Sequence, residues 1–293
     1  MFPRRRTLGE NLVNPTGLAV DALSQRLFWT DWGDRSIVSC SLAAPHAAPE
    51  KRKIGEGLFG HRMDDGPWGI AVDPATSTVV WSSAGSAAVR RADLDGSNVC
   101  ILSEGDSTSW SAKGPWGLAL HLRPGCASFA DRMSSSDVGV KRGGSALRRS
   151  SLPPPERGLG RVFWTSWGRI QSCELGTRQV RDVVRGLIDP TGLVIDQREG
   201  GRIFWTDAKA GKVQCSALDG SQVCDVVTGL DEPFGLAVGP THLFWTDRRR
   251  GTIQSCCLRT GTVCEVIRGL NAPEGAARRG WSQNPSHEFA LLC

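Results

Sequence analysis

The sequence predicts an all-β protein, namely a β-propeller of four-stranded blades. Three observations lead to this prediction. A tetrapeptide of the form Phe-Trp-Thr-Asp recurs along the chain, each good copy follows a second recurring motif of the form Pro-x-Gly-Leu-Ala-Val-Asp, and convincing helical periodicity is absent. Trp164, Trp205 and Trp245 are 41 and 40 residues apart, a length that suits four short strands with their turns. Because a four-stranded sheet buries its faces only against neighbouring sheets, units in series indicate a propeller.

The first strand of each unit is the apolar run within the Pro-x-Gly motif. Gly-Leu-Ala-Val is too short to form a stable helix and is bounded by Pro-x-Gly and Asp, which favours a fully buried strand. The five copies of the motif begin at Pro15, Pro67, Pro115, Pro190 and Pro233.

The second strand is the Phe-Trp-Thr segment, since aromatic and β-branched residues favour strands. A motif present in unit after unit is expected to serve the scaffold, with rings that pack between blades and a carboxylate that caps nearby backbone. A weaker copy at 80–83 reads Val-Trp-Ser-Ser. The good copies consist of Phe28, Trp29, Thr30 and Asp31; Phe163, Trp164 and Thr165; Phe204, Trp205, Thr206 and Asp207; and Phe244, Trp245, Thr246 and Asp247.

The third and fourth strands follow in each unit. Asp95-Gly96 and Asp219-Gly220 predict two-residue turns between them, because glycine accepts the positive φ that such hairpins require. The fourth strand is predicted at 98–102, 180–184, 223–227 and 263–267. The third strands contain Ile37, Val89, Ile170, Val213 and Ile253.

Composition and charge exclude several classes of function. The 293 residues are 40% hydrophobic and 22% charged, as in a globular protein, and the net charge of +5 is too diffuse for a nucleic-acid groove. No run of roughly 18 or more apolar residues occurs, so we expect no direct membrane insertion. No apolar segment follows the basic residues 1–6, so no secretory signal is visible. The sequence therefore indicates an intracellular protein or a piece of a longer chain.

The three-part pattern resembles the YWTD repeats, also called class B repeats, of the low-density lipoprotein receptor group. Phe-Trp-Thr-Asp, the upstream Pro-x-Gly-Leu-Ala-Val-Asp and the downstream Leu-Asp-Gly-Ser carry the resemblance, which covers residues 8–275 apart from one insertion. Phe stands where the family usually has Tyr. The resemblance implies a six-bladed propeller from the extracellular or cell-surface part of a receptor-related or matrix-type protein.

The pattern breaks in three places. Residues 124–160 are polar and proline-rich, so we expect a disordered insertion within the propeller. Residues 276–293 lack an apolar strand and a Trp-Thr-Asp, so the sixth blade is predicted to be incomplete or divergent. Residues 1–7 form a basic stub.

Catalysis finds little support in the sequence. The histidines have no metal-type spacing, and neither a Gly-x-Ser-x-Gly elbow nor a phosphate-binding glycine loop occurs. We therefore expect no enzymatic activity, no catalytic residue, no metal and no cofactor. The alternative is a calcium-dependent propeller hydrolase of the lactonase type, to which Asp34, Asp189 and Glu232 would contribute carboxylates.

Two cysteines are arranged as a possible disulfide. Cys215 and Cys224 lie symmetrically about Asp219-Gly220, so a two-residue turn would set them opposite one another. A cross-strand pair bridges only where the strands are close, so a disulfide and two free thiols that pack as small apolar residues both remain open.

Candidate binding residues gather on one face of the predicted propeller. The loops from a fourth strand to the next first strand open on this face, as do the turns after Phe-Trp-Thr, and the loops before Pro67 and Pro115 are each six residues longer than the one before Pro233. Trp is over-represented at binding hot spots; packing beneath the longer loops is the alternative. The candidates are Trp32, Asp34, Asp64, Asp65, Trp68, Trp110, Trp116, Trp167 and Phe234.

The sequence thus predicts a non-enzymatic module that binds a protein or peptide ligand on the face with the lengthened loops. A degenerate scaffold without a ligand of its own remains the alternative beside the calcium-dependent hydrolase.

Overall fold

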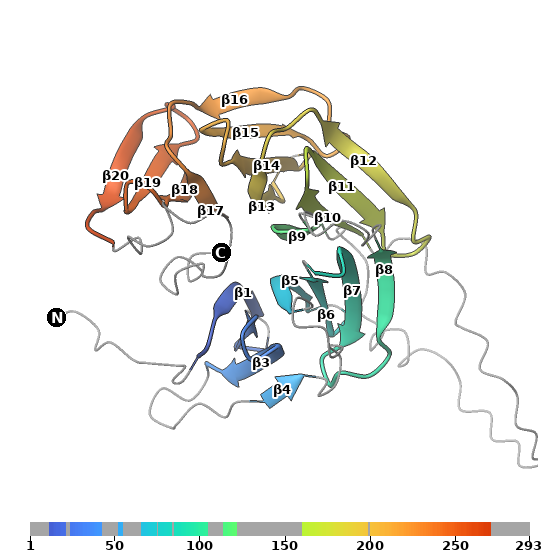
Figure 1. Ribbon diagram of the computed structural model, residues 1–293. Coiled ribbons are helices and arrows are strands. Elements are labelled where there is room, and N and C mark those ends of the chain that lie inside the picture. Colours follow the sequence, from blue (N-terminus) through green and yellow to red (C-terminus); the bar gives the residue numbers. More distant parts are fainter. Residues whose placement is uncertain are drawn as a thin grey trace, which may run out of the picture.

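The computed structural model describes residues 12–21, 24–42, 52–54, 66–74, 76–83, 85–104, 114–121, 160–198 and 200–270. These residues form five antiparallel four-stranded sheets that follow one another around a common centre, with one strand of each sheet nearest the centre (Figure 1). The predicted all-β propeller with five clear blades is confirmed. The predicted sixth blade, the stub at 1–7 and the tail at 276–293 lie outside the described residues. The described residues include no helix of the length and hydropathy that a membrane crossing requires.

The strands have the following bounds. Blade 1 comprises β1 Pro15–Asp21, β2 Arg26–Asp31, β3 Ser36–Ser41 and β4 Arg52–Ile54. Blade 2 comprises β5 Pro67–Asp73, β6 Thr78–Ser83, β7 Ala88–Asp93 and β8 Cys100–Glu104. Blade 3 comprises β9 Leu118–His121, β10 Arg161–Ser166, β11 Arg169–Glu174 and β12 Val180–Arg185. Blade 4 comprises β13 Pro190–Asp196, β14 Arg202–Asp207, β15 Lys212–Ala217 and β16 Cys224–Val227. Blade 5 comprises β17 Pro233–Val238, β18 His242–Asp247, β19 Thr252–Cys257 and β20 Val263–Ile267.

Aromatic rings of the second strands pack between neighbouring blades, as predicted. Phe204 of blade 4 belongs to one buried cluster with Leu236 and Trp245 of blade 5. Phe163 of blade 3 packs with Trp205 of blade 4 in the same way. Since burying such a side chain contributes about 1.5 to 3 kcal/mol, these clusters hold the blades together.

The insertion in blade 3 leaves and rejoins the sheet at neighbouring positions. β9 pairs with β10, and the last pair of that ladder joins His121 to Arg161. Strand pairing therefore resumes after the insertion as the sequence predicts. Of the predicted disordered segment, 124–159 lies outside the described residues, whereas Gly160 is buried and accepts from Leu175 N at 3.1 Å.

The turn between β15 and β16 corrects the prediction of a two-residue hairpin. Ala217 N donates to Ser221 O at 2.9 Å, so three residues separate this hydrogen-bonded pair. Gln222 has a positive φ of 57° and adds one residue on the β16 side. The longer turn and the added residue offset one another, so Cys215 still lies opposite Cys224.

Two predicted fourth strands also begin later than expected. β8 begins at Cys100 rather than at residue 98, because Asn98 has a φ of 54° and donates from Nδ2 to Asp93 at 2.6 Å. β16 begins at Cys224, two residues after Gln222, whose φ is 57°. In both cases a left-handed residue in the turn replaces the start of the strand.

Candidate binding face

The threonine of the Phe-Trp-Thr-Asp motif connects one blade to the next. Thr206 Oγ1 accepts from Gly192 N at 2.7 Å and donates to Phe234 O of blade 5 at 2.7 Å. Thr30 Oγ1 donates in the same way to Trp68 O of blade 2, at 2.6 Å. The carbonyl that accepts belongs to the middle residue of the next Pro-x-Gly, so the backbone of the predicted binding residues is fixed by the neighbouring blade.

The glycine of the same motif is required because the next blade's backbone passes directly over it. A Cβ on Gly17 would lie 2.4 Å from Trp68 O, and one on Gly69 would lie 2.5 Å from Trp116 O. Backbone cannot give way as a flexible side chain does, so any larger residue here would push two blades apart.

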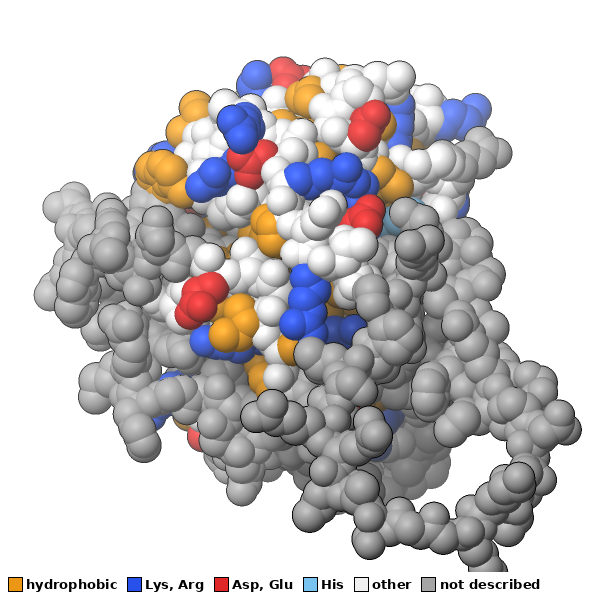
Figure 2. Space-filling view, turned by 90° about the vertical axis from the view of Figure 1, so that its right-hand side faces the viewer, with side chains coloured by type: hydrophobic (Ala, Val, Ile, Leu, Met, Phe, Trp, Pro, Cys, Tyr) orange, Lys and Arg blue, Asp and Glu red, His pale blue; other side chains and the backbone are white. Residues whose placement is uncertain are grey.

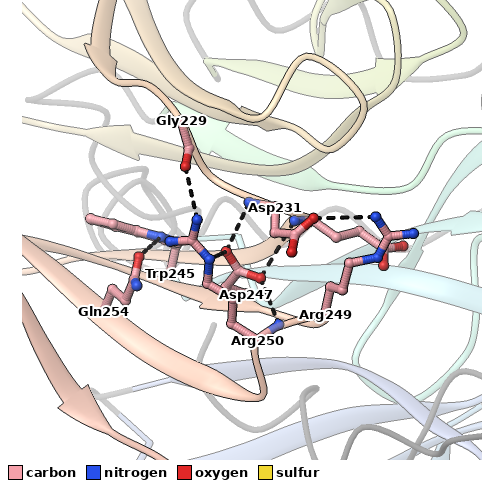
Figure 3. Close-up of polar contacts among 8 residues, drawn as sticks. Gly229, Asp231, Trp245, Asp247, Arg249, Arg250 and Gln254 are labelled. Atoms are coloured by element: carbon pink, nitrogen blue, oxygen red, sulfur yellow. Dashed lines mark hydrogen bonds and ion pairs between the residues drawn. The ribbon is translucent and has the colours of Figure 1, made fainter.

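The aspartate that ends the motif ties the loops of this face together. Asp207 accepts from Ile188 N at 2.8 Å and Asp189 N at 3.0 Å, both before β13, and from Ala210 N at 3.0 Å, after β14. Asp247 does the same in blade 5, where it accepts from Asp231 N at 3.0 Å and Arg250 N at 3.1 Å (Figure 3). These bonds confirm that the carboxylate caps nearby backbone and that both kinds of loop share one face.

Two of the predicted tryptophans contact one another on this face. The rings of Trp68 and Trp116 meet edge to face, with centroids 4.7 Å apart. Both side chains are half-buried. Trp32 lies beside the start of the Pro67-Trp68-Gly69 motif, because a Cβ on the preceding Gly66 would lie 2.5 Å from the ring of Trp32. The structure therefore gathers Trp32, Trp68 and Trp116 at the junction of blades 1, 2 and 3, and we call these three residues the tryptophan corner.

Two other predicted aromatic residues lie against cations on blades 3 to 5. Trp167 is 49% exposed, and the ammonium of Lys209 lies 5.5 Å from its ring centroid. The guanidinium of Arg248 lies 4.8 Å from the ring of Phe234. Lys209 and Arg248 were not among the predicted residues; their signal in the sequence is their position in the turns after Trp-Thr-Asp.

Ion pairs and hydrogen bonds in blade 5 join the loop before β17 to the end of β18 and the turn after it. Arg249 lies 3.3 Å from Asp231, and Arg250 lies 3.8 Å from the buried Asp247 while it donates to Gly229 O at 3.1 Å (Figure 3). The pair of Arg249 and Asp231 is exposed and contributes at most about 1 kcal/mol, so it orders the loop more than it stabilises the fold.

Charge of one sign does not dominate the outer side of the propeller. Figure 2 shows basic, acidic and hydrophobic side chains interspersed over the described residues on this side. Arg169 and Arg185 both pair with Asp182, at 3.5 and 2.7 Å, on the outer strands of blade 3.

The remaining predicted residues fall into two groups. Asp64, Asp65 and Trp110 lie outside the described residues, as do most of the two lengthened loops. Asp34 accepts from Ser36 Oγ at 3.0 Å within its own turn.

The carboxylates of the calcium-dependent alternative do not come together. Asp189 is 4% exposed, and Glu232 lies 3.8 Å from Arg248. Within the described part of the chain, no group of three or more His, Cys, Asp or Glu is placed to hold a metal ion. Asp34, Asp189 and Glu232 therefore do not form the set that this alternative would require.

Sequence comparison finds relatives over a part of the chain. No protein-family model matches the sequence. Protein cueball of Drosophila ananassae is 35% identical over 92 residues, which are 31% of this chain and 14% of that protein. Nidogen-2 of Mus musculus is 33% identical over 86 residues, 29% of this chain and 6% of that protein. The chain thus spans a small share of the length of these relatives.

Structure comparison extends over nearly the whole chain. A propeller in a crystal structure of a nidogen/laminin complex has a TM-score of 0.64 to this chain at 20% identity. The match covers 87% of this chain and 80% of the chain in that complex. The fold of this chain is a YWTD-type β-propeller. Two further solved structures are similar to it. A streptogramin B lyase has a TM-score of 0.60 at 11% identity, and the match covers 88% of this chain and 70% of that one. The calcium-binding protein regucalcin of Agrobacterium tumefaciens has a TM-score of 0.58 at 13% identity, and the match covers 90% of this chain and 76% of that one.

Proposed function

We propose that this YWTD-type propeller is a non-enzymatic module that binds a protein or peptide ligand on the face that carries the tryptophan corner. The observation that carries the proposal is the edge-to-face contact of Trp68 and Trp116 at 4.7 Å. Both rings remain partly accessible while their backbone is fixed by the neighbouring blades, and rigid, half-buried aromatic side chains are the usual anchors of protein interfaces.

Charge on the described part of the face adds a second element of recognition. Lys209 and Arg248 lie over aromatic rings at 5.5 and 4.8 Å, where each cation and its ring present one amphipathic surface. A ligand with an apolar anchor for the tryptophan corner and a carboxylate toward blades 4 and 5 would complement this arrangement. Asp64 and Asp65 add the prediction of a basic group on the ligand near Trp68.

The comparisons support a partner that is a protein. The similar propeller named above was crystallised in a nidogen/laminin complex. We propose by the same likeness that this chain belongs to a matrix-type or receptor-related protein and works outside the cell.

A calcium-dependent hydrolase is the second candidate, favoured by the likeness to the calcium-binding protein regucalcin. Calorimetric titration of the purified chain with Ca²⁺ separates the two functions. Saturable calcium binding would favour the hydrolase over the binding module.

Binding is tested with the purified chain on a surface, first against a laminin fragment and then against a displayed library of random peptides. For the ligand so obtained, Trp68→Ala and Trp116→Ala are each expected to weaken affinity by about 2 kcal/mol, roughly 30-fold in Kd. Trp68→Ala leaves the carbonyl that accepts from Thr30 in place, so the fold is expected to survive.

The matched control is Val223→Ala, because Val223 is 48% exposed in the turn before β16, on the opposite face. It is expected to leave affinity unchanged. If both tryptophan variants keep a native circular dichroism spectrum and bind as the unsubstituted chain does, the tryptophan corner is not the site and the scaffold without a ligand takes its place.

A further inference from the structure

Blade 4 contains two cysteines in direct contact across neighbouring strands. Cys215 on β15 is the register partner of Cys224 on β16. Their Sγ atoms lie 2.7 Å apart, and both residues are thiols in the structure. The sequence left open whether these cysteines form a disulfide or remain free thiols. They lie opposite one another because Gln222 adds one residue before β16.

The equivalent position of blade 5 shows that this arrangement is not a general feature of the repeat. There Cys264 on β20 lies opposite Ser255 on β19. In blade 2, Cys100 on β8 lies opposite Arg91 on β7. An outer-strand cysteine thus recurs, while blade 4 places a second cysteine opposite it.

The two thiols differ in access to solvent. Cys215 is 2% exposed and packs in the cluster between blades 4 and 5 with Phe204 and Cys256. Cys224 is exposed on the outer strand. A reagent from solution therefore reaches Cys224 first.

We propose that Cys215 and Cys224 are a disulfide-forming site, in which Cys224 exchanges with an external disulfide such as oxidised glutathione and Cys215 closes the bond. The thiolate of Cys224 attacks one sulfur of the glutathione disulfide, forming a mixed disulfide and releasing one glutathione thiolate. Cys215, as its thiolate, then attacks the Cys224 sulfur and releases the second glutathione. The protein loses two electrons and two protons, and one glutathione disulfide becomes two thiols.

Burial lowers the reactivity of Cys215 in the closing step. It is the main cause that raises the pKa of Cys215 to about 12, and the hydrogen bond with Cys224 adds to it. The thiolate is the nucleophile in exchange, so little of Cys215 is reactive at neutral pH. Contact between the two sulfurs compensates, because the second attack is intramolecular.

The closed bond would join the outer strand of blade 4 to the interface with blade 5. β16 is four residues long, and its other side-chain links to β15 include Lys212 to Asp225 at 2.8 Å and Gln214 to Asp225 at 2.7 Å. A disulfide from Cys224 to Cys215 would hold this short strand against β15, and thereby against the buried cluster. Disulfides of this kind belong to oxidising compartments.

The test uses the full chain, reduced and then freed of reductant, in a buffer of oxidised and reduced glutathione. After an acid quench and alkylation, cleavage before Asp219 and Asp225 separates the two cysteines unless a disulfide joins them. The expected product is a pair of linked peptides, lower in mass by two hydrogen atoms and without alkylation at either cysteine. Its unfolding midpoint in urea is expected to fall when reductant is added.

Two single substitutions test the order of attack. Cys215→Ser gives blade 4 the serine that blade 5 has at Ser255, and is expected to accumulate one glutathione on Cys224. Cys224→Ser is expected to leave Cys215 unmodified. If the unsubstituted chain keeps both thiols free in a buffer that modifies Cys224 of the Cys215→Ser chain, or if Cys215 of the Cys224→Ser chain reacts, the proposal is wrong. The measurement requires no binding partner, so its outcome is independent of the proposed function.

Discussion

Thr206 donates its hydroxyl proton to the carbonyl oxygen of Phe234, 28 residues further along the chain and in the next blade, at 2.7 Å. The same hydroxyl accepts from Gly192 N. One small side chain therefore satisfies a donor of its own blade and an acceptor of the next.

Replacing this hydroxyl is expected to destabilise the junction of blades 4 and 5. Thr206→Val keeps the shape of the side chain but leaves Gly192 N and Phe234 O without this partner, which should lower the free energy of unfolding by about 1 to 3 kcal/mol. Thr206→Ser keeps the hydroxyl and should lower it much less. Urea denaturation followed by Trp fluorescence compares the two; equal losses would show that the methyl group, and not the hydrogen bond, matters.

The scaffold could be predicted from the sequence because its determinants recur within single units. Repetition of Phe204-Trp205-Thr206-Asp207 was enough to predict strands, inter-blade rings and a capping carboxylate. The role of Thr206 could not be predicted, because its acceptor lies in another unit and the pattern does not say which neighbour the hydroxyl reaches. Cys215 and Cys224 show the same limit: their pairing was predicted by symmetry, but the turn that produces it has a different length.

The Pro-x-Gly glycine is expected to tolerate no side chain. A Cβ on Gly117 would lie 2.3 Å from Thr191 O and 2.8 Å from Leu193 N. Gly117→Ala should therefore lower the melting temperature by several degrees or prevent folding, since backbone must move to admit the methyl group. Gly239→Ala is the control, because its nearest neighbour would be His242 O at 3.5 Å. Equal melting temperatures for the two variants would contradict the close approach of blades 3 and 4.

The insertion of blade 3 is expected to be replaceable by a short turn. His121 pairs with Arg161 as Asp196 pairs with Arg202 in blade 4, where residues 197–201 complete the turn. Putting the sequence of 197–201 in place of 122–160 should change the melting temperature little. A fall of more than about 10 °C, several kcal/mol for a domain of this size, would show that the removed segment packs on the propeller.

Alkaline pH is expected to weaken the junction of blades 2 and 3 through Cys173. Burial raises the pKa of this thiol from 9.0 to about 11. A raised pKa means that the folded state holds the proton more tightly, so this contribution to stability is complete below pH 9 and is lost as pH rises toward 11. The loss is on the order of 2 kcal/mol.

Cys173→Ala provides the comparison, since blade 2 has Ala92 at the equivalent position of its third strand. Urea denaturation at several pH values is expected to give a steeper alkaline decline for the unsubstituted chain than for the variant. Parallel declines would mean that other groups account for the whole effect.

How much of the candidate binding face the sequence reveals depends on the kind of contact. The convergence of Trp68 and Trp116 follows from the shared Pro-Trp-Gly motif, because equivalent corners of consecutive blades are neighbours in any propeller. Lys209 and Arg248 were not predicted to join the face. They lie in turns whose sequences differ between blades, and the pairing of each cation with a ring depends on side-chain conformations that periodicity does not encode.

Blade 1 contains a buried indole without a hydrogen-bond partner among the described residues. In blades 3, 4 and 5 the Trp of the motif donates from Nε1 to a Gln on the third strand, for example Trp205 to Gln214 at 3.1 Å. In blade 1 the register partner of Trp29 is Val38, and the buried Nε1 of Trp29 has no hydrogen-bond partner among the described residues. A buried donor without a partner costs free energy, so a Gln at this position should recover some of it.

The amide of the new Gln also requires a partner, which blade 4 provides through Asp225 at 2.7 Å from Gln214 Nε2. Lys53 is the residue opposite Val38 on β4, so Val38→Gln with Lys53→Asp would copy the whole arrangement. The double variant is expected to raise the free energy of unfolding by about 1 kcal/mol, and Val38→Gln alone by less, because its amide then lacks an acceptor. Urea denaturation of the two variants and the unsubstituted chain decides the matter. A double variant no more stable than the single one would show that the relay of Trp, Gln and Asp does not transfer between blades.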